Sequence, residues 1–75
     1  GTPLAIEVRA HITGTVWKIE TTPGATVSEG DVLVILESMK MEMPIEAPAD
    51  GKVLEIKIQE GQRIAEGAVV LILED

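Results

Sequence analysis

The chain contains no cysteine, no phenylalanine, no tyrosine and only one histidine, His11. Without cysteine it can form no disulfide, and a single histidine cannot build a zinc site. His11 also has no cysteine to activate, so we expect no metal centre and no catalytic site of the chain's own. The lack of cysteine fits a reducing compartment, so the expected location is the cytoplasm, or the mitochondrial matrix in a eukaryote.

Basic residues are also scarce. Six lysines and arginines stand against 13 aspartates and glutamates, which gives a formal net charge of −7. Nucleic acids and anionic membrane surfaces are bound through stripes of lysine and arginine, so neither is an expected partner. No apolar run approaches the roughly 18 residues of a membrane-spanning helix, and no signal peptide opens the chain. The acidic surplus is best interpreted as a source of solubility.

The length of 75 residues suits one small domain, predicted to span residues 1–75 and to be monomeric. A domain of this size buries only about 60% of the surface that its unfolded chain exposes. Hydrophobic residues make up 45% of the chain, and Trp17 is the only aromatic residue. Packing of valine, isoleucine and leucine therefore has to supply the stability.

The sequence contains one internal duplication. Residues 10–38 align without a gap onto residues 47–75 at a constant offset of 37. A unit this small cannot bury an apolar face alone, so the two copies must pack on each other. The identical pairs are Ala10/Ala47, Gly14/Gly51, Val16/Val53, Ile19/Ile56, Gly24/Gly61, Glu29/Glu66, Gly30/Gly67, Val32/Val69, Ile35/Ile72, Leu36/Leu73 and Glu37/Glu74.

Short β-branched runs separated by turn signals predict an all-β domain. We expect a flattened eight-strand barrel or sandwich, built from two four-strand halves that face each other about a quasi-twofold axis. Trp17 should share a strand face with Ile19, in the core or half-buried, and Leu54 should share one with Ile56 and Ile58. The longer strands are predicted at 4–10, 15–21, 32–38, 41–47, 52–58 and 68–74, with turn glycines at Gly14, Gly24, Gly30, Gly51, Gly61 and Gly67.

Lys40 lies where the chain passes from one copy to the other. The strands on either side leave room only for a tight hairpin over residues 38–41, and the central residues of such a hairpin need positive φ. The segment Ser38-Met39-Lys40-Met41 contains none of the glycine, asparagine or aspartate that these turns prefer. Local backbone strain of this kind tends to persist at functional sites.

The duplication also predicts where the lysine lies in the molecule. The offset of 37 maps Lys40 onto Pro3 and Ser38 onto Asp75. The Lys40 turn and the chain ends should therefore lie at opposite poles of the domain. From the residues alone two interpretations stay open. In the first, a partner recognises the lysine at this position. In the second, Lys40 is an ordinary solvated charge in an exposed hairpin, and Met39 and Met41 are plain strand-end packing.

The segment Glu37-Ser38-Met39-Lys40-Met41 resembles the biotin attachment motif of biotin carboxyl carrier domains, in which a Met-Lys-Met triplet presents the modified lysine. The resemblance covers nearly the whole chain: the duplicated halves, the glycine-rich turns and the lysine at the central hairpin. The commoner family spelling has alanine where Ser38 stands. The Ser38 version, continued by Glu42-Met43-Pro44-Ile45, is most similar to small biotin/lipoyl attachment proteins and to some carboxylase carrier domains.

This resemblance implies that a biotin protein ligase attaches biotin, the cofactor, covalently to Lys40. Met39 and Met41 would be the apolar flanks that the ligase reads, and Ser38 and Glu37 would complete the motif. Glu42 would either contribute to that reading or remain a solvated acid. The other implied partners are a biotin carboxylase, which supplies carboxylate, and a carboxyltransferase, which receives it. The chain itself would be a carrier without catalysis.

Two other functions remain as alternatives. Lipoyl domains share the expected fold, and a carrier of lipoate, or of both groups, would serve acyl or aminomethyl transfer. Their lysine usually lies in Asp-Lys-Ala, which differs from Met39-Lys40-Met41. Unmodified lipoyl-like modules of membrane-fusion adaptors usually flank long coiled coils, and no heptad pattern occurs in this sequence.

Overall fold

The structure, a computed structural model, describes residues 5–75, and every regular element in it is a β-strand. No helix that could span a membrane occurs in this part of the chain. The predicted first strand residue, Leu4, and the predicted counterpart of Lys40, Pro3, lie outside the described residues. The strands are β1 (Ala5–Arg9), β2 (Gly14–Ile19), β3 (Thr26–Val27), β4 (Val32–Ser38), β5 (Met41–Glu46), β6 (Gly51–Ile56), β7 (Arg63–Ile64) and β8 (Val69–Glu74).

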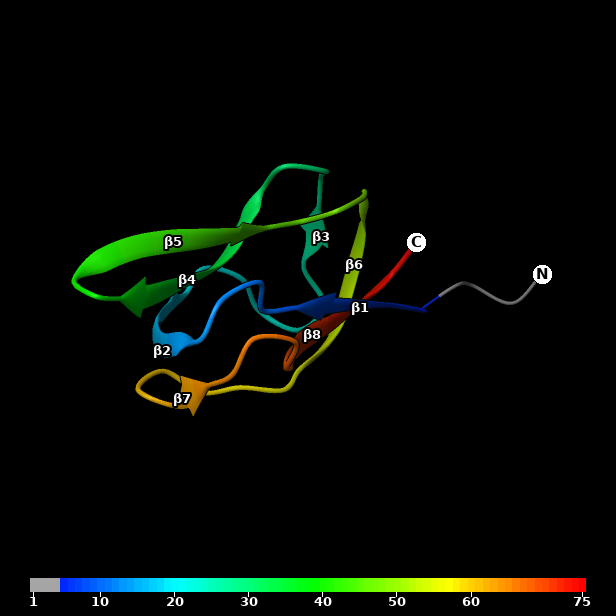
Figure 1. Cartoon of the computed structure of the whole chain (residues 1–75). Coiled ribbons are helices and arrows are strands. Elements are labelled where there is room, and N and C mark those ends of the chain that lie inside the picture. The colour runs from blue at the N-terminus through cyan, green and yellow to red at the C-terminus, as the bar shows by residue number, and fades with distance from the viewer. Residues whose placement is uncertain (1–4) are drawn as a thin grey trace.

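The strands form two four-stranded antiparallel sheets, ordered β1-β8-β6-β3 and β5-β4-β2-β7. They face each other as a flattened sandwich that does not close into a barrel, so the predicted all-β class is confirmed (Figure 1). Each sheet takes two strands from the first half of the chain, which holds β1 to β4, and two from the second half, which holds β5 to β8. Strands of the first half are at the edges of one sheet and in the centre of the other, so the two halves interlock.

The offset of 37 residues converts one sheet into the other, strand by strand. The registers follow the same rule, since Val16 pairs with Leu36 in one sheet and Val53 pairs with Leu73 in the other. The backbone hydrogen bonds that lie outside the strand ladders also fall into equivalent pairs. The predicted quasi-twofold relation therefore extends from the sequence to the hydrogen-bonding pattern.

Strands β2 and β6 are shorter at their ends than predicted. They end at Ile19 and Ile56, two residues before the expected positions 21 and 58. After each of these ends the chain crosses to the opposite sheet, because β3 pairs with β6 and β7 pairs with β2. Residues 20–21 and 57–58, which were expected to extend these strands, therefore belong to the connections between the sheets.

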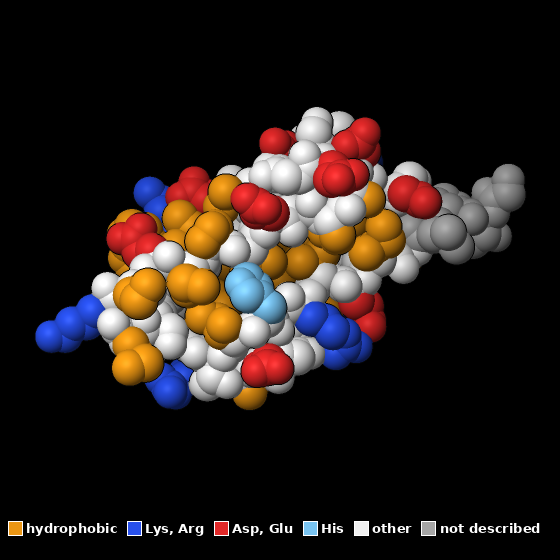
Figure 2. All heavy atoms as spheres, turned by 45° about the horizontal axis from the view of Figure 1, so that its top comes forward, with side chains coloured by type: hydrophobic (Ala, Val, Ile, Leu, Met, Phe, Trp, Pro, Cys, Tyr) orange, Lys and Arg blue, Asp and Glu red, His pale blue; other side chains and the backbone are white. Residues whose placement is uncertain are grey.

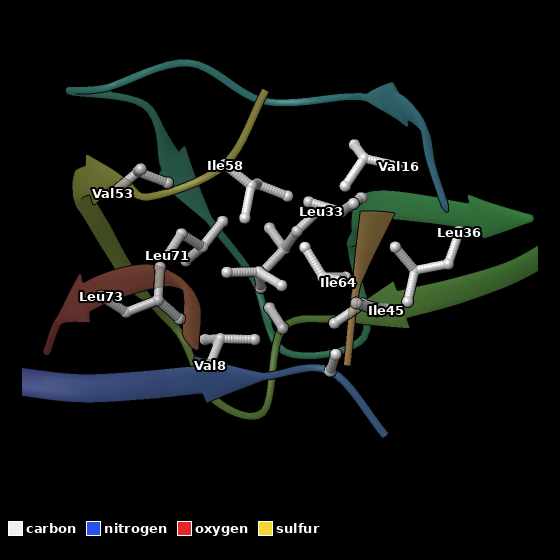
Figure 3. Packing of buried hydrophobic residues seen from close by; sticks show 14 of the residues in the cluster. Val8, Val16, Leu33, Leu36, Ile45, Val53, Ile58, Ile64, Leu71 and Leu73 are labelled. Atoms are coloured by element: carbon white, nitrogen blue, oxygen red, sulfur yellow. The ribbon is translucent and has the colours of Figure 1, made fainter. Parts of the chain in front are cut away.

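The core lies between the sheets and consists of aliphatic side chains from both copies. Figure 3 shows Leu33, Leu71 and Ile64 directed into the same space from different strands. Among the described residues no polar or charged side chain is buried. Full burial of one valine, leucine or isoleucine side chain contributes about 1.5–3 kcal/mol. Aliphatic packing is therefore the main source of stability, as predicted.

Trp17 lies on the surface, so of the two places predicted for it, in the core or half-buried on a strand face, the core is wrong. The β2–β4 ladder shifts register at Trp17, and 48% of this residue is exposed. Leu54 occupies the equivalent bulge in β6 and is 45% exposed. A bulge inserts one residue and so breaks the alternation of faces. Trp17 and Leu54 are therefore separated from Ile19 and Ile58, which pack on or within the core.

The predicted turn glycines fall into two groups. Gly24, Gly30, Gly61 and Gly67 have φ between 89° and 90°, as turns of this kind require. Gly14 and Gly51 differ, because they begin β2 and β6 and have no positive φ. A Cβ at Gly14 would lie 2.7 Å from the carbonyl oxygen of Glu37. Glycine is needed there because another backbone approaches closely, so the prediction of a turn role was wrong for this pair.

Candidate functional site

The β4–β5 hairpin carries Lys40 at its turn. Ser38 pairs with Met41, so only Met39 and Lys40 lie in the loop. Their φ angles are 53° and 65°, and no other residue except glycine among residues 5–75 has a positive φ. Two successive residues with positive φ form the type I′ turn, whose twist matches that of the flanking strands. The tight hairpin predicted at residues 38–41 is confirmed.

This turn is held in a costly backbone conformation. For a residue with a Cβ, the left-handed region costs roughly 1–2 kcal/mol. The β4–β5 ladder opposes that cost, because its pairing continues without a gap from the Ser38/Met41 pair to the Ile35/Pro44 pair. β4 is also a central strand, paired with β2 on its other side. Close backbone packing of Gly14 against the Glu37 carbonyl supports the base of the hairpin.

The turn residues project into solvent. Met39 is 92% exposed and Met41 is 63% exposed. Packing therefore does not explain Met39, and that alternative interpretation is wrong for it. Lys40 is also exposed, and no hydrogen bond or ion pair holds its amine within the described chain. Its Nζ is accessible to an enzyme that approaches the turn.

The lysine and the C-terminus lie at opposite ends of the molecule. Figure 1 shows the β4–β5 turn at one end and the C-terminus at the other. At the latter end Ala5, the first described residue, pairs with Glu74. The prediction that the Lys40 turn and the chain ends lie at opposite ends of the domain is confirmed for the described part of the chain. Figure 2 shows several hydrophobic side chains gathered at the end that carries the turn.

Two carboxylates lie one ladder position beyond the closing pair of the turn. Glu37 and Glu42 are directly opposite each other across the β4–β5 ladder, and both are exposed. Neither belongs to an ion pair within residues 5–75. Like charges at opposed positions are unfavourable in a sheet. Ser38, the remaining predicted site residue, is half-buried at the closing pair of the turn.

The other surface features lie away from the turn. One open groove of about 620 Å³ is lined by residues including Thr21, Thr26 and Val32, and a second of about 410 Å³ includes His11. Lys40 lines neither groove. Within the described residues no cluster of three or more acidic, histidine or cysteine side chains is placed to hold a metal ion. The turn therefore stands apart as a presented amine with apolar flanks.

The sequence identified Lys40 and its neighbours, but it gave Gly14 the wrong role and did not place Met43. Gly14 was expected in a turn, and its close approach to β4 becomes visible only when β2 and β4 are paired. The available signal was that glycine recurs at the equivalent position, Gly51, where the Glu74 carbonyl oxygen approaches as closely. Met43 was quoted only as part of the motif, and the structure places it, half-buried, opposite Leu36 in the hairpin.

Comparison with known proteins connects this geometry to a family. Residues 4–73 match the family described as "Biotin-requiring enzyme". A 44-residue segment is 48% identical to the biotinylated protein TB7.3 homolog of Mycobacterium leprae and covers 59% of this chain and 62% of that relative. A 43-residue segment is 49% identical to the biotin-dependent acyl-coenzyme A carboxylase alpha3 subunit of the same species, covering 57% of this chain and 7% of the subunit.

A solved structure shows the same fold. A single-chain, multi-domain long-chain acyl-CoA carboxylase superposes with a TM-score of 0.90 at 30% identity, over 99% of this chain and 7% of that protein. The interlocked sandwich with its central hairpin therefore also occurs within a far larger carboxylase chain. The family match covers nearly all of the sequence, and the fold agrees with it. The chain belongs to the biotin/lipoyl attachment family of biotin-requiring enzymes.

Proposed function

We propose that this chain is a biotin carboxyl carrier whose Lys40 receives biotin covalently. The observation that carries the proposal is the isolated, exposed amine of Lys40 at a two-residue turn between Met39 and Met41. The family match and the names of two relatives, one a biotinylated protein and one a subunit of a biotin-dependent carboxylase, support it.

Lys40 fits the attachment better than the other lysines of the chain. The amine of Lys18 lies 3.9 Å from a Glu20 carboxylate oxygen, and that of Lys57 lies 3.1 Å from one of Glu55. Lys52 is exposed but lies within the β6 ladder, paired with Thr26 on one side and with Glu74 on the other, and not at a turn. Only Lys40 combines a turn position, an exposed side chain and an amine without an acidic partner.

Attachment uses Lys40 as a nucleophile and the ligase as the catalyst. The deprotonated Nζ attacks the activated carboxyl carbon of biotin, an amide bond forms, and the activating group leaves. The amine proton passes to a base of the ligase, because no described residue is hydrogen-bonded to Nζ. The neutral amide removes one positive charge, so the formal net charge changes from −7 to −8.

The domain then presents the attached group and carries out no chemistry itself. Bound biotin supplies a nitrogen that carries carboxylate from a biotin carboxylase to a carboxyltransferase. The rigid hairpin fixes the root of the lysine arm, and the opposite end of the domain is available for a tether. Movement on such a tether sets the effective concentration of the arm at each enzyme. We place this activity in the cytoplasm, with the domain acting as a monomer.

Intact-mass measurement tests the proposal directly. The chain is expressed with and without a biotin protein ligase, together with two variants, Lys40→Arg and the matched control Lys52→Arg. We expect one biotinyl adduct on the wild type and on Lys52→Arg, and none on Lys40→Arg. An adduct on Lys40→Arg, or no adduct on the wild type, would overturn the assignment.

A parallel reaction with a lipoyl ligase and lipoate tests the alternative cofactor. We expect no lipoyl adduct under conditions in which a known lipoyl domain is fully modified. Modification by lipoate alone would make the chain a lipoyl carrier. Modification by both groups would make it a dual carrier.

A further inference from the structure

All the sulfur atoms of this protein lie within one short segment around Lys40. The chain has three methionines and no cysteine, and the methionines are residues 39, 41 and 43. Two of them flank the lysine directly. In a chain without thiols, exposed thioethers are the groups most readily oxidised by a peroxide.

The three thioethers differ strongly in exposure. Met39, in the turn, is 92% exposed, and Met41, at the closing pair, is 63% exposed. Met43 is half-buried opposite Leu36. Since oxidation follows access of the oxidant to sulfur, Met39 should react first, Met41 second and Met43 last.

The fold should tolerate oxidation at the first two positions. Neither Met39 nor Met41 belongs to the buried core cluster or to the side chains packed against it. The backbone of the turn is held by the β4–β5 ladder and not by these side chains. A sulfoxide there changes the surface of the hairpin and leaves the core as it is.

We propose that Met39 and Met41 form a reversible oxidation site that controls the enzyme steps at Lys40. The inference rests on the proposed function, because it concerns enzymes that handle this lysine. A sulfur lone pair attacks one oxygen of hydrogen peroxide, an S–O bond forms and the O–O bond breaks. The thioether is oxidised by two electrons to the sulfoxide, and the peroxide is reduced to water. Methionine sulfoxide reductases reverse the change.

Oxidation changes what an approaching enzyme meets. A thioether is apolar and adapts its shape to a binding pocket, whereas a sulfoxide is polar and has a fixed dipole. A pocket that receives Met39 or Met41 in its reduced form would have to bury an unpaired S=O oxygen, which is unfavourable. We expect kcat/KM to fall by about threefold to tenfold in biotinylation of Lys40, in carboxylation of the biotinylated chain, or in both, which at about 1.4 kcal/mol per tenfold is a modest change in binding.

The test compares peroxide-treated and untreated samples of the same chain. Intact mass and peptide mapping give the order of oxidation, and circular dichroism checks that the fold is retained. Rates are then measured with a biotin protein ligase on the unmodified chain and with a biotin carboxylase on the biotinylated chain. Treatment with methionine sulfoxide reductases A and B should restore the rates.

Two variants separate the site from other effects of peroxide. In the double variant Met39→Leu/Met41→Leu the ratio of treated to untreated rate should be close to one for each step. In Met43→Leu the ratio should fall as it does in the wild type. If oxidation of Met39 and Met41 leaves both rates unchanged, or if the double variant responds like the wild type, the inference is wrong. A failure of the proposed function would look different, because the untreated chain would then accept no biotin.

Discussion

Replacement of Lys40 by glycine should make the unmodified domain more stable, although it removes the attachment amine. Lys40 has a φ of 65°, where a residue with a Cβ loses about 1–2 kcal/mol. Glycine avoids this cost but loses about 0.5–1 kcal/mol more conformational entropy on folding. The midpoints of these two ranges give a net gain in the free energy of unfolding of about 0.75 kcal/mol, or about 3–6 °C in Tm for a domain of this size.

The assay is thermal and urea unfolding followed by far-ultraviolet circular dichroism. Lys52→Gly is the matched control, because Lys52 is also exposed but lies in β6 without a positive φ. This control should lose about 0.5–1 kcal/mol, since glycine gains nothing within a strand. If Lys40→Gly is destabilised as much as Lys52→Gly, the turn is not strained, and the argument that the lysine is held there against its backbone preference fails.

Two further predictions concern residues that support the hairpin. Gly14→Ala would place a Cβ 2.7 Å from the Glu37 carbonyl oxygen, and this overpacking should cost about 1–3 kcal/mol. The equivalent change Gly51→Ala should cost the same in urea unfolding, but only Gly14→Ala should slow biotinylation of Lys40, and equal rates would contradict this. Leu36→Ala removes a fully buried side chain and should cost about 2–5 kcal/mol in the free energy of unfolding. Leu73→Ala should lose a similar amount, and a loss at only one of the two positions would show that the halves are not energetically equivalent.

Much of the fold could be predicted because its signals are local. Gly24 and its three counterparts mark turns whose φ angles only glycine adopts easily, and the structure has all four at about +90°. The duplication fixed the relation between the halves, because two copies of one sequence fold into two copies of one unit. The hairpin at residues 38–41 followed from the lack of space between two strands, which is again a local constraint.

What could not be predicted depends on contacts between distant segments. That β1 pairs with β8, and β3 with β6, is invisible in a pattern of apolar runs. The bulge at Trp17 comes from the pairing of β2 with β4, and an apolar residue between Val16 and Lys18 looks like an ordinary strand position. Gly14 was misread for the same reason, since its neighbour across the sheet is known only from the register.

The candidate site divides in the same way. The backbone conformation of Lys40 could be expected from the length of the loop, and the structure has it. Its exposure was expected on either interpretation of the lysine and is confirmed, whereas the exposure of Met39 could not be separated from strand-end packing by the sequence alone. The opposition of Glu37 and Glu42 follows from the hairpin register and was overlooked. The chemical role of Lys40 stays a prediction until the mass of the modified chain is measured.

The exchange of strands between the two sheets has a consequence for the integrity of the molecule. A fragment that ended at the hairpin would keep the β2–β4 pair, but its other two strands would have lost every neighbour. Neither half can persist by itself, so unfolding should be a single cooperative transition. By the same reasoning, a protease that cut the chain between Met39 and Lys40 would leave two peptides that remain associated through strand pairing in both sheets, without a covalent link.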